Sequence, residues 1–170
     1  MKKLDIKLSK EINASSDKVW EILGPNFLSI SEWGTGILSS VNNADAELRF
    51  DDAPAGGRVC DIKGFGKFDE RILHYSHDDK EITWSADSPK IPGFVNGLQN
   101  AFRIEELGEN KSRISSNLTA NMRGVGGFLF GGKIKSNFEK TIEIFLTDIK
   151  IYAETGKVSP RKERELNKAS

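Results

Sequence analysis

The chain has 170 residues, of which 37% are hydrophobic and 29% are charged, as is usual for a soluble globular domain. Its 25 basic residues equal its 25 acidic residues, so no overall field favours nucleic acid as a partner. The single cysteine, Cys60, excludes an intramolecular disulfide and is typical of a reducing compartment. Because no apolar run has the length of a signal peptide or a membrane span, a cytoplasmic protein without stable membrane insertion is expected.

The first part of the chain predicts a strand followed by two short helices. Residues 3–13 alternate between apolar and polar side chains, which is the period of a half-buried strand. Ser15, Ser16 and Asp17 can cap a helix that begins there and ends at Gly24. Residues 26–31 are expected to form a second short helix that leads to Trp33.

The middle of the chain predicts a series of strands, and the C-terminal part predicts one long helix. Turn residues separate strands at about 36–42, 46–51, 57–64, 67–76, 80–88, 96–106 and 112–122. An apolar stripe of helical period then comprises Ile134, Phe138, Ile142, Phe145, Ile149 and Tyr152. With no second long helix to cover it, this stripe must face the sheet, and a curved sheet would leave part of the space between them hollow.

The remaining C-terminal residues, 157–170, form a charged segment beyond a predicted single domain of residues 1–156. We interpret this segment as a solvated tail, because charged termini without an apolar face usually stay in water.

A glycine-rich segment, 124–132, precedes the long helix and is predicted to be a loop. Its spacing approaches that of a phosphate-binding loop, but Ile134 stands where a hydroxyl would hold magnesium, and the chain lacks βαβ alternation. Two interpretations of Phe128 and Phe130 stay open: they plug one end of the core, or they form a lid over a pocket mouth. His74 and His77 lack metal-ligand spacing, so neither a metal nor another cofactor is expected.

Strand parity places a carboxylate among apolar side chains. Glu70 shares a strand face with Phe68 and Ile72, and Trp84 belongs to the apolar face of the next strand. A buried carboxylate is costly unless it is paired or hydrogen-bonded, so Glu70 either contacts a ligand or a partner, or lies at an exposed strand edge. Lys63 is the nearest basic candidate for its partner.

The same parity argument applies to a later strand, in which Asn96 and Asn100 share a face with Phe94 and Phe102. The two amides are therefore further candidates for hydrogen bonds to a ligand in an aromatic-lined pocket. The alternative is that a bulge or exposure at a strand edge places them in water.

Six short segments, in their order along the chain, resemble the START-like, polyketide cyclase/dehydrase superfamily, which includes the birch-pollen allergen and the plant abscisic-acid receptors. They are residues 12–23, 30–33, 57–59 with 69–75, 102–105 and 138–143, and the resemblance covers about residues 3–153. It implies an α+β helix-grip fold, in which a curved seven-stranded antiparallel sheet wraps around a long C-terminal helix and encloses a cavity for hydrophobic ligands. In the related plant receptors the glutamate of a Glu-Arg-Ile/Leu stretch lines the cavity, and Glu70 stands at that position here. The receptors' Ser-Gly-Leu-Pro gate has no counterpart, because residues 63–66 are Lys-Gly-Phe-Gly.

The resemblance favours binding or carriage of a small hydrophobic ligand, such as a lipid, an isoprenoid or an aromatic metabolite. One alternative is a cyclase or dehydratase-like enzyme with Glu70 as its general base, and another is a protein-interaction module without a ligand. Sequence leaves open whether the chain is a monomer or a dimer. The residues expected to contact the ligand are Trp33, Lys63, Phe68, Glu70, Trp84, Phe94, Asn96, Asn100, Phe128, Phe138, Thr141 and Phe145.

Overall fold

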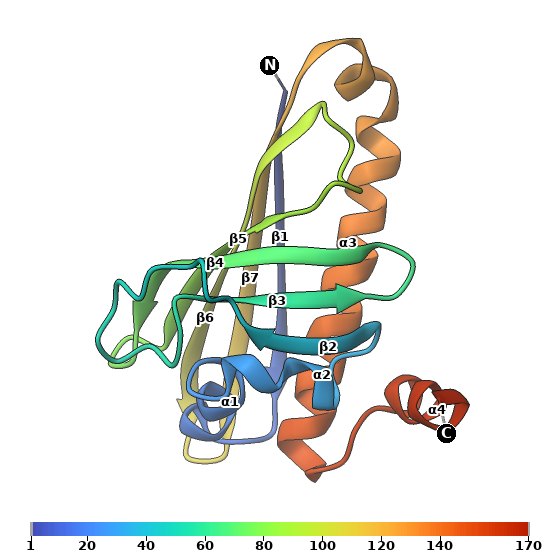
Figure 1. Cartoon of the computed structure of the whole chain (residues 1–170). Coiled ribbons are helices and arrows are strands. Elements are labelled where there is room, and N and C mark those ends of the chain that lie inside the picture. The colour runs from blue at the N-terminus through green and yellow to red at the C-terminus, as the bar shows by residue number, and fades with distance from the viewer. Residues whose placement is uncertain (1, 170) are drawn as a thin grey trace.

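A seven-stranded antiparallel sheet wraps around one long helix in the computed structural model, which describes residues 2–169 apart from the side chain of Phe128 (Figure 1). The strands are β1 (Lys2–Ile12), β2 (Ile37–Asn42), β3 (Gly57–Ile62), β4 (Gly66–Ser76), β5 (Glu81–Asp87), β6 (Val95–Gly108) and β7 (Lys111–Met122), in the sheet order β1-β7-β6-β5-β4-β3-β2. The helices are α1 (Ser16–Leu23), a short 3-10 turn at Phe27–Ser29, α2 (Ile30–Trp33), α3 (Gly124–Thr155) and α4 (Pro160–Ala169). The expected α+β helix-grip fold is therefore confirmed, and β3 and β4 cross α3 while β1 and β7 run alongside it.

One predicted strand, residues 46–51, is wrong, because these residues belong to the loop between β2 and β3. The apolar residues that suggested a strand, Ala46 and Phe50, are half-buried against the sheet without pairing with it, and Phe50 lies edge-on to His74. The loop is held at its base, where the side-chain amide of Asn43 donates a hydrogen bond to Asp69 (3.0 Å). The apolar residues of this segment thus pack a loop on the sheet and do not belong to a hydrogen-bonded strand.

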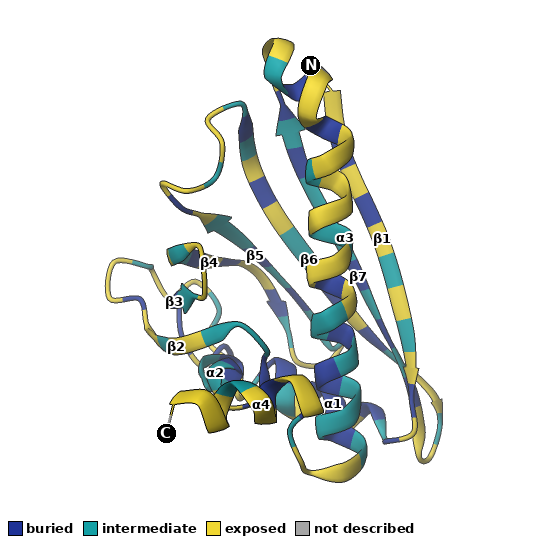
Figure 2. Cartoon of the chain, turned by 90° about the vertical axis from the view of Figure 1, so that its right-hand side faces the viewer, coloured by how far each residue is buried: buried dark blue, intermediate teal, exposed yellow. Residues whose placement is uncertain are grey.

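The two halves of α3 differ in how they meet the sheet (Figure 2). In the C-terminal half, Ile142 and Ile149 of the predicted stripe are buried together with Leu146 and Ala153, while Phe145 and Tyr152 of that stripe are half-buried. In the N-terminal half, Ile134 and Phe138 of the stripe are only half-buried.

Polar contacts reinforce this difference, because among the described residues they tie the C-terminal half of α3, and not its N-terminal half, to β1 and the residue after it. Lys10 contacts Glu143 and donates a hydrogen bond to Thr147 (2.9 Å). Further along the helix, the Lys150 ammonium donates to the carbonyl of Glu11 (2.7 Å), and the backbone amide of Asn13 donates to Glu154 (2.7 Å). The C-terminal half of α3 is therefore clamped to the sheet, while its N-terminal half faces the sheet more loosely.

The prediction that the glycine-rich segment 124–132 is a loop is wrong, because these residues form the first turns of α3. A Cβ on Gly126 would lie 2.7 Å from the ring of Phe94, and one on Gly127 would lie 2.9 Å from the side chain of Met122. Glycine therefore lets the start of the helix approach β6 and β7 more closely than any other residue could. Phe130 stacks on Phe94 (centroids 6.5 Å apart) and stays exposed, so it does not plug the core.

The interpretation of residues 157–170 as a solvated tail is wrong for Ser159 and Lys162, which are buried where α4 packs against the rest of the chain. Ser159 caps α4 by accepting a hydrogen bond from the amide of Lys162 (3.3 Å), and its hydroxyl donates to the buried carboxylate of Asp148 on α3 (2.5 Å). The same carboxylate accepts a hydrogen bond from the amide of Thr35 (2.7 Å). These contacts join α4, α3 and the segment between α2 and β2.

Lys162 completes this attachment, since its ammonium donates to the carbonyl of Ile37 (2.8 Å) and contacts Glu165 (3.4 Å). We expect Lys162→Met to lower the free energy of unfolding by about 1–3 kcal/mol, because it leaves a carbonyl and a carboxylate without their donor. Urea denaturation of this variant should be compared with that of Lys168→Met, which removes an exposed ammonium from the same helix. Equal denaturation midpoints for the two variants would contradict a structural role for the attachment.

Candidate ligand-binding site

Glu70 and Arg58 form a buried ion pair on the inner face of the sheet. Strands β3 and β4 pair these two residues directly, and Arg58 Nε lies 2.5 Å from Glu70 Oε2. The guanidinium also donates through Nη1 to the carbonyl of Phe27 (2.5 Å). The prediction that Lys63 is the partner of Glu70 is wrong, because Lys63 is exposed in the turn after β3. Parity along β3 could have indicated Arg58 instead, because Arg58 shares the inner face of that strand with the apolar Cys60.

Aromatic rings enclose the cation of this pair. The guanidinium carbon of Arg58 lies 3.9 Å from the ring centroid of Phe27 and 5.1 Å from that of Trp84. A cation over aromatic faces in a desolvated place gains electrostatic attraction in addition to the ion pair. Arg58 therefore balances the negative charge of the Glu70 carboxylate in the core, and Glu70 serves there as the counter-ion of Arg58.

Cys60 lies beside this pair, with its Sγ 3.8 Å from Glu70 Oε2. Burial, and then the charge of Glu70, raises the pKa of the Cys60 thiol to about 11, so less thiolate is present at neutral pH than for an ordinary cysteine. We expect the native protein to react with iodoacetamide at least about a hundredfold more slowly at about pH 8 than the urea-unfolded chain does. Rapid stoichiometric labelling of the native protein would contradict the buried position of this thiol.

A chain of aromatic rings crosses the space between the sheet and the helices. Trp84 stacks on Phe102 (4.9 Å between centroids), and Phe102 contacts Phe145 of α3 (5.0 Å). Phe145 in turn meets Trp33 of α2 (5.2 Å), which stacks on Tyr152 (6.3 Å). Three of the predicted site residues are thus brought together, and two further rings, Phe102 and Tyr152, join them. This part of the predicted hollow is filled by packed side chains.

Two hydrogen-bond donors around this aromatic chain are not used by the protein itself. The Nε1 of Trp33 is buried and has no partner among the described residues. Asn100 is on the inner face of β6, where its Oδ1 accepts a hydrogen bond from Ser116 (2.8 Å), and no described group accepts from its amide nitrogen. The half-buried Asn100 can therefore donate to an oxygen atom of a ligand, whereas Trp33 Nε1 lies in the part that packed rings fill.

The prediction that Asn96 shares a face with Asn100 is wrong. The register pairs Asn96 with Asn121 and Val95 with the buried Met122. Asn121 points to the outer face, because the residues on either side of it in β7, Ala120 and Met122, are buried. A bulge between Asn96 and Gln99, with Gly97 at a φ of +63°, inserts a residue and reverses the alternation. Asn96 consequently lies on the outer face, and only Asn100 faces inward.

The remaining predicted residues are divided between the inner surfaces and solvent. Thr141 is exposed and donates its hydroxyl hydrogen to a backbone carbonyl one turn earlier in α3, so its predicted role as a lining residue is wrong. Phe68, Phe94 and Phe138 are half-buried, on β4, before β6 and on the inner stripe of α3 respectively. The side chain of Phe128 lies outside the described part of the structure.

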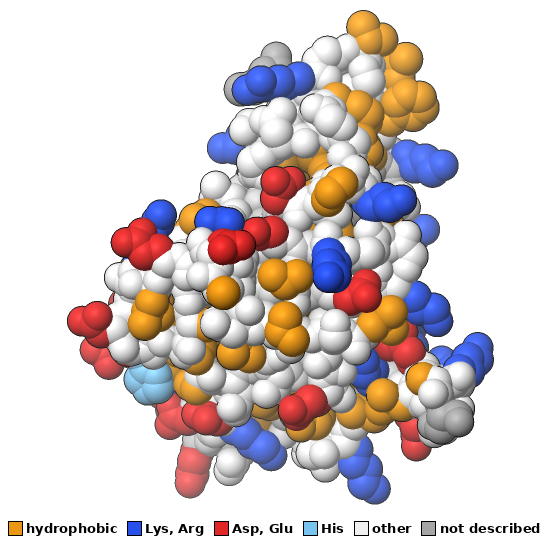
Figure 3. Space-filling model, in the orientation of Figure 1, with side chains coloured by type: hydrophobic (Ala, Val, Ile, Leu, Met, Phe, Trp, Pro, Cys, Tyr) orange, Lys and Arg blue, Asp and Glu red, His pale blue; other side chains and the backbone are white. Residues whose placement is uncertain are grey.

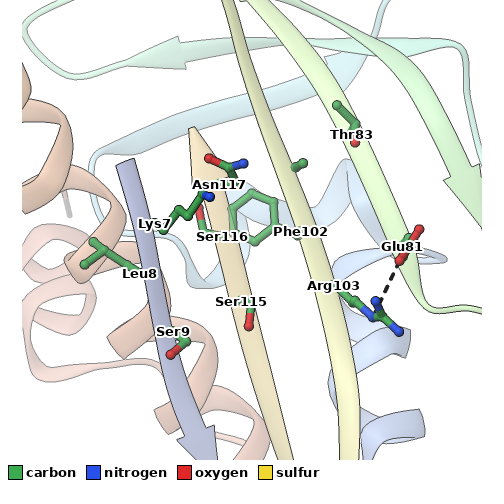
Figure 4. A pocket seen from close by; sticks show the side chains of 11 residues that line it. Lys7, Leu8, Ser9, Glu81, Thr83, Phe102, Arg103, Ser115, Ser116 and Asn117 are labelled. Carbon is green, nitrogen blue, oxygen red and sulfur yellow. Dashed lines mark ion pairs between the residues drawn. The ribbon is translucent and has the colours of Figure 1, made fainter. Parts of the chain in front are cut away.

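A hollow of about 460 Å³ lies on the opposite face of the sheet, away from α3 (Figure 4). Its polar lining comes from alternate positions of β1, β5, β6 and β7 and includes Lys7, Ser9, Thr83, Arg103, Ser115 and Asn117. These positions alternate with the buried side chains of the same strands. The hollow is therefore separate from the predicted site on the inner face.

Comparison with known proteins places the fold in a family. Residues 3–154 match the family model described as polyketide cyclase / dehydrase and lipid transport, whereas no curated protein matches the chain in sequence. A START superfamily protein from Mycobacterium smegmatis superposes with a TM-score of 0.71 at 15% identity, covering 90% of this chain and 99% of that one.

Two enzymes share the same fold. The Zhui aromatase/cyclase from a Streptomyces species has a TM-score of 0.69 at 14% identity, with 90% of this chain and 94% of that chain covered. Norcoclaurine synthase from Thalictrum has a TM-score of 0.66 at 12% identity, with 89% and 94% covered. At these identities the likeness shows the fold alone, but the family model spans nearly the whole sheet and α3. The chain therefore belongs to the polyketide cyclase/dehydrase and lipid-transport family of START-like proteins.

Proposed function

We propose that this protein binds and carries a small, mostly apolar molecule between the N-terminal half of α3 and the inner face of the sheet, in the cytoplasm. The observation that carries the proposal is the incomplete burial of the apolar side chains on these two facing surfaces. Ile134 and Phe138 of α3 and Phe68 of β4 are half-buried. In the C-terminal half of α3, by contrast, Ile142, Leu146, Ile149 and Ala153 are buried, and the half-buried Phe145 and Tyr152 pack on Trp33.

An apolar ligand would remove these side chains from water. Each Å² of apolar surface covered contributes roughly 25 cal/mol, from which the loss of ligand freedom must be subtracted. The N-terminal half of α3 also lacks the hydrogen bonds that clamp the C-terminal half to β1, as far as the described residues show. This half can therefore move to admit a ligand at lower cost than the clamped half.

A free donor indicates which apolar molecules fit best. The amide nitrogen of Asn100 can donate to a carbonyl or hydroxyl oxygen, and a hydrocarbon would leave it unpaired. We therefore propose a ligand with an apolar body and at least one oxygen acceptor.

The enzyme alternative has less support in the geometry. A general base needs a carboxylate that can reach a substrate proton, and one oxygen of Glu70 already accepts from the buried Arg58 (2.5 Å). The second oxygen of Glu70 could still accept a proton, but both side chains are buried, so a substrate would have to enter the core to reach it. Carriage without turnover is therefore the function that this site supports better.

Titration with the neutral fluorescent probe N-phenylnaphthylamine tests the proposal. We expect saturable binding that Phe138→Ser weakens at least about tenfold, because the substitution removes apolar contact area from the facing surface. Leu48→Ser, an exposed substitution in the loop between β2 and β3, should leave the affinity unchanged.

Native mass spectrometry of freshly purified protein provides the second measurement, and a reproducible small-molecule adduct is expected. Asn100→Leu should reduce the occupancy of that adduct while leaving probe binding intact, since the probe has no oxygen acceptor. Absence of both probe binding and an adduct would contradict the proposal and favour a protein-interaction module.

A further inference from the structure

We propose that the start of α3 is a docking tip with which the protein rests on the surface of a bilayer that contains anionic phospholipids. The docking tip comprises the exposed apolar residues Val125, Leu129 and Phe130 and the flanking basic residues Lys2, Arg123 and Lys133. This role goes beyond ligand binding, and it holds whether or not the inner face carries a molecule.

The apolar part of the docking tip is exposed to an unusual degree. Val125, Leu129 and Phe130 are 73%, 65% and 54% exposed, in a chain whose other large apolar side chains are mostly buried. Val125 and Leu129 are four residues apart in a helix, so they share one face. Phe130 stacks on the half-buried Phe94, which continues the apolar surface toward β6. Contiguous apolar surface of this kind marks an interaction site.

The docking tip also has the position that a flat partner requires. It lies at the extreme end of the molecule, beside the N-terminus and far from the short helices at the other end (Figures 1 and 3). Hydrophobic side chains protrude there over the first turns of α3, with basic side chains to either side. A flat surface can thus reach these side chains without contact with the rest of the protein.

Charge selects the kind of partner. From residue 121 to residue 138 the chain contains Arg123, Lys133 and Lys135 but no acidic residue, although the whole chain is neutral. Lys135 pairs with Glu139 (3.7 Å), whereas Arg123 and Lys133 have no acidic partner among the described residues. Lys2 adds its charge from β1, with its Nζ 3.8 Å from the position of a Cβ on Gly131. The docking tip is therefore apolar in its centre and positive at its margin.

This arrangement fits an anionic bilayer better than a second copy of the chain. A symmetric dimer through the docking tip would bring the same cations of both copies together, and like charges would repel. A bilayer surface with anionic headgroups instead attracts the basic residues while its interface accepts the apolar ones. The contact would be peripheral, since none of the described helices combines the length and the hydropathy needed to cross a membrane.

Flotation with vesicles tests this inference. The wild-type protein should bind vesicles of phosphatidylcholine mixed with phosphatidylglycerol, bind pure phosphatidylcholine weakly, and dissociate as salt is raised. Leu129→Ser/Phe130→Ser and Arg123→Glu/Lys133→Glu should each weaken binding at least about tenfold, because each pair contributes a separate part of the attraction. Matched controls are Leu38→Ser/Val41→Ser, equally exposed on β2, and Lys157→Glu/Lys168→Glu near the C-terminus, which should bind like the wild type.

Circular dichroism and urea denaturation of each variant should show that the fold is retained, and analytical ultracentrifugation should show the same oligomeric state as the wild type. The inference is overturned if the wild-type protein does not float with anionic vesicles, or if the control pairs weaken binding as much as the docking-tip pairs. It is also overturned if the docking-tip pairs only dissociate an oligomer. Probe binding to the inner face is measured without vesicles, so a negative flotation result does not contradict the proposed ligand binding.

Discussion

Replacement of Arg58 by methionine is expected to lower the free energy of unfolding by about 3–5 kcal/mol, because it leaves the buried Glu70 carboxylate without its partner. The double variant Arg58→Met/Glu70→Leu should recover most of this loss, since both charges are then removed from the core. Urea denaturation followed by circular dichroism measures both values. A double variant as unstable as Arg58→Met would show that packing of Arg58 on Phe27, rather than the ion pair, is the important contribution.

The neighbouring pair of Arg71 and Asp69 provides a matched control. It has a similar contact distance (2.9 Å), but its side chains lie about half in solvent on the other face of β4. We expect Arg71→Met to cost less than about 1 kcal/mol, because water solvates Asp69 when the guanidinium is lost. An equal effect of Arg58→Met and Arg71→Met would contradict the inward position of Glu70.

Replacement of Phe102 by alanine is the second change with a large expected effect, a loss of about 3–5 kcal/mol in the free energy of unfolding. Phe102 is buried and contacts both Trp84 and Phe145, so its removal opens a gap in the middle of the aromatic chain. Thermal or urea denaturation measures the loss, and the emission of Trp84 should change because its stacking partner is gone.

Phe65→Ala serves as the control for this change, since Phe65 is exposed in the turn between β3 and β4. We expect an effect within about 0.5 kcal/mol, as for most surface substitutions. If Phe102→Ala were equally mild, the aromatic chain would not be part of the stabilising core, and the space around it would have to be open to solvent.

The sequence by itself determined the elements with strong periodicity and the order in which they occur. Alternation over residues 3–13 predicted β1, turn residues delimited the strand at about 112–122 that is β7, and the apolar stripe from Ile134 to Tyr152 predicted most of α3. These patterns are local, because they depend only on which face of one strand or helix is buried. The inward position of Glu70 also followed from parity, since β4 has no bulge before Ile72.

The tertiary structure decided which residues meet across the fold. Arg58 rather than Lys63 pairs with Glu70, because the register of β3 on β4 places Arg58 opposite it. Asn96 faces outward because a bulge at Gly97 reverses the alternation of β6, and a bulge depends on pairing with the neighbouring strands. Parity along β3 indicates that Arg58 faces inward but not which residue lies opposite it, and parity along β6 cannot reveal the bulge.

Tertiary contacts likewise decided the structure of two segments for which the sequence prediction failed, residues 124–132 and 157–170. The glycine-rich residues 124–132 are helical because they pack closely on Phe94 and Met122, a contact that compensates for the low helix propensity of glycine. The charged C-terminal segment is ordered because Asp148 and the carbonyl of Ile37, both distant in sequence, receive its hydrogen bonds. Local propensity cannot predict such contacts, because the free energy that stabilises them comes from groups that only the folded chain brings together.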